Sequence, residues 1–146
     1  MRKLIIAISA IALAGTAAMA DPIADRQALM KANGKAAGVL APIVKGEKPF
    51  DAEAVMAALK TLEENADKLD VAKLFPAGSD KGGDTTASPK IWEATADFQA
   101  KVEKFKADTA AALAAAPKDV SELKTQFGMI GASCGGCHES FRIKKG

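Results

Sequence analysis

The sequence predicts an all-α protein that folds as an antiparallel four-helix bundle. After the first twenty residues, Gly- and Pro-containing breaks divide the chain into four stretches, each too long for a β-strand. Apolar residues recur within each stretch at three- and four-residue intervals, the period of a helix with one buried face. Most connections between the stretches are short, which favours antiparallel packing of neighbouring helices.

Residues 1–20 have the features of a secretory signal peptide. Two basic residues precede an apolar run over residues 4–14, and a small-residue cleavage site ends at Ala20. The alternative, a membrane anchor, would need about twenty apolar residues. We therefore expect export to the periplasm, cleavage after Ala20, no membrane attachment afterwards, and a single domain over residues 21–146.

Charge and cysteine content exclude two classes of protein. The chain has 20 Lys and Arg residues against 18 Asp and Glu residues, and two of the basic ones lie in the signal peptide, so the mature domain has 18 of each. A nucleic-acid-binding protein needs a surplus of cationic side chains, so we expect no nucleic-acid partner. The only two cysteines lie in one short segment, so no disulfide framework is expected.

The first helix is expected from Asp21-Pro22 to Val44. Asp is a favoured N-cap, Pro suits the first helical turn, and Gly46 lies just beyond the end. The side chains predicted to point inward from this helix are Leu29, Met30, Ala37 and Leu40.

The second helix is expected from an Asp51 cap to about Leu74, where Phe75-Pro76 ends it. Residues 77–87 are rich in Gly, Ser, Thr and Asp and show no periodicity, so they are predicted to form the one long loop. We expect this loop to carry no chemistry.

Two further helices complete the bundle. The third is predicted as one continuous amphipathic helix from Ser88-Pro89 to Ala116. The fourth begins at Asp119, with Glu122 in a capping-box arrangement, and continues through the cysteines to Phe141. The apolar stripe of the third helix comprises Ile91, Thr95, Phe98, Val102, Phe105, Thr109, Ala112 and Ala116.

The segment Cys134-Gly135-Gly136-Cys137-His138 has the C-x-x-C-H pattern typical of covalent haem attachment. In a helix, residues three and four positions apart share a face. One turn can therefore bond the edge of the macrocycle through two cysteine sulfurs and present the only histidine of the sequence to iron. We predict one haem c, attached through Cys134 and Cys137, with His138 as an axial ligand.

Two other functions use a similar motif. A thiol–disulfide oxidoreductase also contains C-x-x-C, but at the start of a helix that follows a strand, and no strand is predicted here. A structural zinc site would need a second pair of ligands, which the sequence does not offer. Four glycines in or beside the motif, at positions 128, 131, 135 and 136, weaken an isolated helix, so we expect the fourth helix to be loose without haem.

The chain resembles the cytochrome c′ family, four-helix bundles with C-x-x-C-H near the C-terminus. The matching stretches are Arg26-Gln27 and residues 42–46, 89–92 and 127–142. The resemblance covers the whole mature chain. It implies that the haem lies between the helices near one end of the bundle, and that the residue facing the iron opposite the histidine comes from the first helix.

The distal position of that family corresponds to Met30, four residues after Arg26. The resemblance therefore implies the low-spin cytochrome c-556 type, with His138 and Met30 as axial ligands. The alternatives are that Met30 only fills the core, with Met56 as the reserve ligand, or that the iron is five-coordinate and binds nitric oxide or carbon monoxide. The resemblance also implies that Arg26 lies near the haem propionates and Arg142 beside the proximal imidazole; the alternative for both is a solvated surface charge.

Iron ligated by histidine and methionine has no open position for a substrate and suits one-electron transfer. We therefore expect an electron carrier rather than an enzyme, with redox proteins of the periplasm as partners. The cationic cluster of Arg142, Lys144 and Lys145 is a candidate docking site for an acidic partner. Some members of the family dimerise through their first two helices, so a homodimer is a further expectation.

Overall fold

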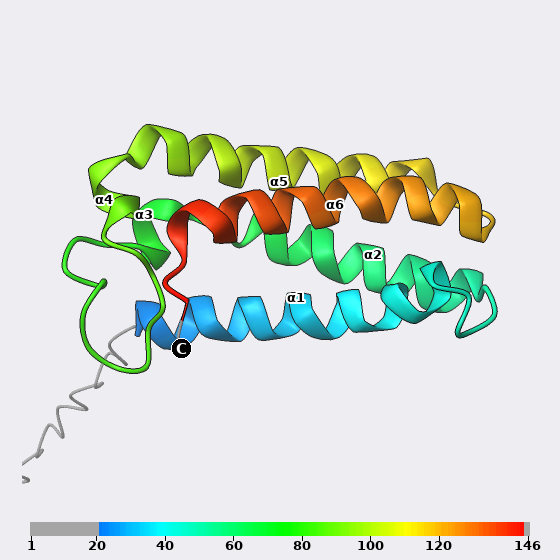
Figure 1. Cartoon of the computed structure of the whole chain (residues 1–146), viewed down its shortest axis with the longest axis horizontal. Coiled ribbons are helices and arrows are strands. Elements are labelled where there is room, and N and C mark those ends of the chain that lie inside the picture. The colour runs from blue at the N-terminus through cyan, green and yellow to red at the C-terminus, as the bar shows by residue number, and fades with distance from the viewer. Residues whose placement is uncertain (1–20, 145–146) are drawn as a thin grey trace, which may run out of the picture.

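The computed structural model describes residues 21–144; the predicted signal peptide and Lys145 lie outside the described residues. The described part of the chain forms six helices: α1 (Pro22–Val44), α2 (Ala52–Asp67), α3 (Val71–Leu74), α4 (Lys90–Glu93), α5 (Thr95–Ala115) and α6 (Val120–Phe141). The four long helices lie side by side, each antiparallel to the next along the chain (Figure 1). This confirms the predicted all-α four-helix bundle.

Three of the four long helices, α1, α2 and α6, begin where their capping residues predict. The Asp21 carboxylate accepts a hydrogen bond from the Ile23 amide at 3.0 Å, and Asp51 accepts one from Ala54 at 3.1 Å. Asp119 accepts from the Glu122 amide at 2.9 Å. Each bond satisfies a backbone donor that has no partner inside its own helix.

The predicted end of the second helix, at about Leu74, is wrong. Helix α2 ends at Asp67, and Asp70 caps the separate short helix α3, accepting a hydrogen bond from the Lys73 amide at 3.1 Å. An Asp side chain competes for backbone donors in this way, which favours a new helix start over continuation. The chain therefore changes direction before Phe75.

The predicted third helix is also interrupted. Ala94 has φ −128° and ψ 53°, which separates the short helix α4 from α5. The Trp92 indole N–H donates to the Phe75 carbonyl at 3.0 Å and to the Pro76 carbonyl at 3.2 Å. These bonds hold α4 against the chain that follows α3, out of line with α5.

The apolar stripes predicted for α5 and α6 face the interior. Phe98, Val102, Phe105 and Ala112 are buried on α5, whereas Thr95 and Ala116, two other members of the predicted stripe, are exposed. Leu40 of α1 is fully buried, but Met30 of the same helix is 37% exposed. The largest fully buried side chains are Leu40, Val55, Leu59, Leu62, Thr109, Leu123 and Ile130.

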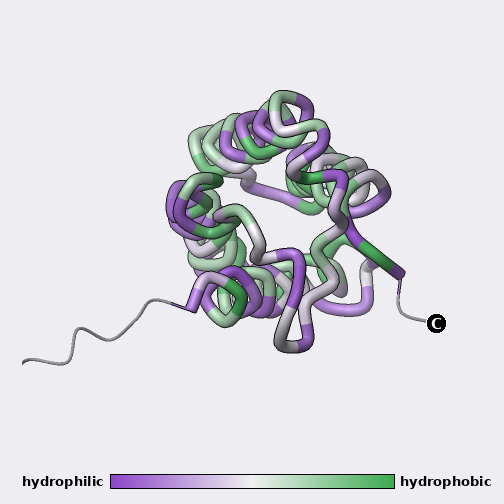
Figure 2. Tube along the Cα trace, turned by 90° about the vertical axis from the view of Figure 1, so that its left-hand side faces the viewer, coloured by the Kyte–Doolittle hydropathy of each residue, from purple (hydrophilic) through white to green (hydrophobic). Residues whose placement is uncertain are grey.

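One end of the bundle is closed by the loop between α3 and α4, viewed from outside in Figure 2. The Ser88 amide donates to the Phe141 carbonyl at 3.0 Å, and the Ile143 amide donates to the Thr86 carbonyl at 2.8 Å. An isolated antiparallel bridge joins Ala87 to Arg142. The loop is thus attached to the C-terminal end of α6. Among residues 21–144, no helix is long and apolar enough to span a membrane.

Candidate functional site

A cavity of about 740 Å³ lies between α1 and α6 near the loop end of the bundle. This volume falls within the range of about 300–1,000 Å³ typical of ligand and cofactor sites. Cys134, Cys137 and His138 line it from α6, and Met30 lines it from α1. Its apolar walls are formed by Leu62, Leu69, Phe75, Ile91, Phe98, Val102, Phe105, Phe127, Ile130 and Phe141.

The C-x-x-C-H segment occupies the last part of α6, so both cysteines and the histidine share the helix face that lines the cavity. Burial raises the pKa of the Cys134 thiol. Burial and the neighbouring Cys134 raise the pKa of Cys137, while Lys101 opposes that shift. Reactive thiols of oxidoreductases have lowered pKa values and occupy helix starts, so the environment of these cysteines does not favour thiol–disulfide chemistry.

The imidazole environment favours metal binding. Burial lowers the pKa of His138, and the positive charge of Arg142 lowers that pKa further. The neutral imidazole is the form that ligates iron. Within residues 21–144 there is no group of three or more His, Cys, Asp or Glu side chains placed to hold a metal ion by themselves, so the zinc alternative gains no additional ligands.

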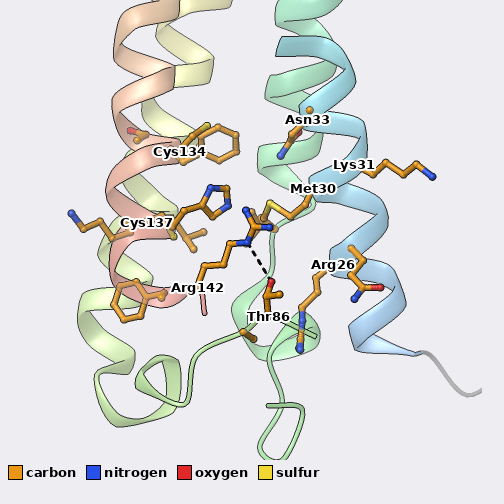
Figure 3. Close-up of a pocket in the computed structure, with 18 of the residues that line it drawn as sticks. Arg26, Met30, Lys31, Asn33, Thr86, Cys134, Cys137 and Arg142 are labelled. Atoms are coloured by element: carbon orange, nitrogen blue, oxygen red, sulfur yellow. Dashed lines mark hydrogen bonds between the residues drawn. The ribbon is translucent and has the colours of Figure 1, made fainter. Parts of the chain in front are cut away.

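Met30 faces the same cavity from the opposite helix. In Figure 3 its side chain extends from α1 toward α6, with the sulfur at the inner end. The reserve candidate Met56 packs against the core and, like Met129, is not among the residues that line the cavity. Of the methionines in the described residues, Met30 therefore has the geometry expected of a distal ligand.

The space between the two helices fits a flat macrocycle. Gly34 of α1 and Gly131 of α6 both line the cavity, and a Cβ built on either residue meets no atom within 4 Å. Ala37 continues the small-residue surface of α1. Two thiols and an imidazole on one wall suit a covalently attached haem, and the apolar space between the helices and the thioether on the other wall are compatible with it.

Arg26 lines the cavity, but most of its hydrogen bonds go to the loop. Its side chain is only 5% exposed. Nη1 donates to the Leu74 carbonyl at 3.0 Å and to Ser79 Oγ at 2.9 Å; Nη2 donates to the Ser79 carbonyl at 2.5 Å and to Thr85 Oγ1 at 2.7 Å. The guanidinium also lies 5.0 Å from the centroid of the Phe75 ring. Burial lowers its pKa, although the Asp21 carboxylate opposes that shift.

The loop lines part of the candidate site, a position that its sequence did not predict. Asp84, Thr85, Thr86 and Ala87 all line the cavity. Gln27 donates from Nε2 to the Asp84 carbonyl at 3.1 Å. The polar composition of the loop predicts exposure to solvent, and only the tertiary structure reveals that it closes the cavity.

Arg142 is exposed and lines the cavity mouth. Its Nε donates to Thr86 Oγ1 at 3.4 Å, the contact drawn in Figure 3. Its charge reaches His138, as the lowered pKa of that imidazole indicates. Lys144 is exposed beyond it.

Sequence reasoning missed two buried polar residues that line the cavity. Asn33 of α1 is 9% exposed and accepts a hydrogen bond from Asn65 of α2 at 3.0 Å. Ser133 of α6 is 5% exposed and donates to the Asp108 carboxylate of α5. A polar residue at a position of the inward helical face is the only signal that could have identified either one.

Comparison with known proteins agrees with this geometry. The family model for cytochrome c′ matches residues 21–142. The cytochrome c-556 of Agrobacterium fabrum is 43% identical over 132 residues, which cover 90% of this chain and 88% of that protein. The cytochrome c-556 of Rhodopseudomonas palustris is 43% identical over the full length of both chains. The solved cytochrome c′ of R. palustris superposes with a TM-score of 0.81 at 40% identity, covering 88% of this chain and 100% of that one. The chain therefore belongs to the cytochrome c′ family, whose members hold a covalently attached haem c with iron.

Proposed function

We propose that this protein carries single electrons in the periplasm through one haem c, attached through Cys134 and Cys137 and ligated by His138 and Met30. The observation that carries the proposal is the placement of the Met30 side chain in the same cavity as His138, on the facing helix. The periplasmic location is inferred from residues 1–20, which resemble a signal peptide.

Haem supplies a one-electron couple when it is bound, and the residues of this chain determine how that couple behaves. His138 and Met30 would together hold the iron, which would leave no position for a substrate. A thioether ligand favours ferrous iron and so raises the reduction potential. Both residues belong to long helices that pack against neighbouring helices, so we expect their separation to change little with oxidation state.

The aromatic side chains at the loop end form part of the apolar wall of the cavity. The Phe98 ring packs edge-on against Phe75 at 4.8 Å and against Phe141 at 5.1 Å between centroids. A dry, apolar surrounding reduces the solvent rearrangement that accompanies each electron transfer. We expect redox partner proteins with acidic surfaces to dock near Arg142 and Lys144, which are exposed beside the cavity mouth.

Optical spectroscopy of the haem-loaded protein tests the ligand assignment. We expect a sharp low-spin reduced spectrum that carbon monoxide does not alter, and a high-spin spectrum that responds to carbon monoxide after Met30→Ala. Met56→Ala is the matched control, because Met56 lies outside the cavity lining, and it should leave the spectrum unchanged.

The second candidate function is that of a high-spin cytochrome c′, with a five-coordinate iron that binds nitric oxide or carbon monoxide. It is supported by the similarity to a solved cytochrome c′. A wild-type spectrum that is already high-spin and shifts with carbon monoxide would favour this function and remove Met30 from the ligand set.

A further inference from the structure

A pair of buried amides lies between α1 and α2 at the inner side of the cavity. Asn33 is 9% exposed and Asn65 is 6% exposed. The Asn65 Nδ2 group donates to Asn33 Oδ1 at 3.0 Å, which anchors the Asn33 side chain to the neighbouring helix. Burying an amide costs free energy unless its polar atoms find partners. The position of Asn33 in a largely apolar wall therefore requires an explanation.

The amide nitrogen of Asn33 is the part of this pair that faces the cavity. Asn33 lines the cavity, and Figure 3 shows its side chain directed from α1 into it, close to Met30. Among the described residues, none accepts a hydrogen bond from Asn33 Nδ2. Every fully buried side-chain nitrogen or oxygen of these residues has a partner, so Nδ2 is not fully buried. The nitrogen is therefore open to the cavity rather than enclosed by protein.

The position of Asn33 places this donor on the distal side. It follows Met30 by three residues, so the two side chains share one face of α1, opposite the wall formed by α6. The thioether of Met30 is only a weak acceptor. Many of the side chains that line the cavity with Asn33, among them Leu62, Phe105 and Ile130, are apolar and offer no acceptor. In such surroundings a hydrogen bond is stronger than in water.

We propose that Asn33 is the distal hydrogen-bond donor of this protein and that it selects which exogenous ligand the iron binds when the Met30 sulfur is absent. The site would favour small anions that accept a hydrogen bond, such as azide, over carbon monoxide, which accepts poorly. The inference rests on the proposed placement of haem between His138 and α1, but not on ligation by Met30.

The test compares haem-loaded Met30→Ala with Met30→Ala/Asn33→Leu, because leucine branches at the same carbon atom as asparagine and donates no hydrogen bond. Azide is titrated into the ferric proteins and carbon monoxide into the ferrous ones. Loss of one buried hydrogen bond should weaken azide binding about three- to tenfold, and the affinity for carbon monoxide should change less than about twofold. Met30→Ala/Asn65→Leu keeps the donor but removes its anchor, so its loss of azide affinity should be smaller.

An unchanged azide affinity would overturn the proposal. An equal loss of azide and carbon monoxide affinity would overturn it too, because that pattern indicates a general packing defect. If Asn33→Leu prevents folding, Asn33→Ala replaces it in the same titrations. A wild-type spectrum that is high-spin would show that the Met30 assignment has failed; azide and carbon monoxide titrations of wild type and Asn33→Leu would then still test Asn33 alone.

Discussion

The two helices that face each other across the cavity contribute to the site in different ways. Helix α6 supplies Cys134, Cys137 and His138 within little more than one turn, so the covalent chain itself fixes their spacing. Helix α1 supplies Met30 and Asn33, whose distance from α6 depends on how the whole bundle is packed. Helix α6 packs mainly against α5, and α1 mainly against α2. The arrangement of the proximal side is thus fixed within one helix, whereas that of the distal side depends on how the helices pack together.

The loop between α3 and α4 connects these two sides. Arg26 of α1 donates to Ser79 and Thr85, and the other end of the loop is bonded to Phe141 and Ile143 at the end of α6. The contact between α1 and α6 is therefore reinforced where the cavity is widest. If this comparison is correct, substitutions on the two sides should have separable effects.

The largest effect is expected for the proximal side. Replacing both attachment residues, Cys134→Ser with Cys137→Ser, should abolish covalent haem attachment, because no other cysteine exists in the chain. Mass spectrometry of the denatured protein measures this directly. Met30→Ala is the matched distal variant and should retain the haem mass, since it removes an axial ligand but neither thioether. A haem adduct in the double serine variant would contradict the assignment of the motif.

A smaller effect is expected for the distal side. Arg26→Leu leaves the Leu74 and Ser79 carbonyls without their charged donor and should lower the free energy of unfolding by about 3 kcal/mol, since each such bond contributes roughly 1.5–3 kcal/mol. Denaturant titration measures the loss, and the optical spectrum should shift toward high spin as α1 moves. The exposed Arg142→Leu, which loses one bond of 3.4 Å, is the control and should change stability by less than about 1 kcal/mol. Equal losses in both variants would mean that the loop does not depend on Arg26.

The smallest effect concerns how α6 is held against α5. Burial raises the pKa of Asp108, but hydrogen bonds from Lys104 and Ser133 and the charge of Lys104 outweigh burial, so the pKa lies below its ordinary value. A lowered pKa contributes stability above the unfolded carboxyl pKa of about 3.9, and this stability is lost as pH falls through the folded value. Asp108→Asn should cost about 1–2 kcal/mol at pH 7 and less near pH 3.

Unfolding curves of wild type and Asp108→Asn, recorded at pH 7 and near pH 3, give the difference in the free energy of unfolding between the two proteins at each pH. A difference that stays constant with pH would show that the charge of Asp108 contributes nothing. The optical spectrum should be the same in both proteins at pH 7, because Ser133 remains in place beside the attachment residues.

Some features of the protein could be predicted from local sequence. The starts of α1, α2 and α6 each depend on a side chain and an amide two or three residues away, at Asp21, Asp51 and Asp119. The C-x-x-C-H motif depends on residues that share one helical turn. Neither requires any knowledge of distant parts of the chain, so the bundle and the proximal wall could be recognised without coordinates.

Other features depend on partners that are far away in sequence. The break at Ala94 follows from the bonds of Trp92 to Phe75 and Pro76, and no local pattern announces it. The sequence of the loop is that of an ordinary polar connection. In the structure, carbonyl and hydroxyl groups of the loop and of the preceding α3 accept hydrogen bonds from the buried guanidinium of Arg26.

The sequence by itself therefore determined the four-helix architecture, the starts of α1, α2 and α6 and the C-x-x-C-H motif, because these follow from contacts within one or two turns. The tertiary structure alone decided what the loop does and that Asn33 turns its amide into the cavity. These outcomes depend on packing between helices that are separated by more than thirty residues, as Asn33 and Asn65 are. Periodicity identifies the buried face of a helix, but only the packed bundle determines which atoms that face meets.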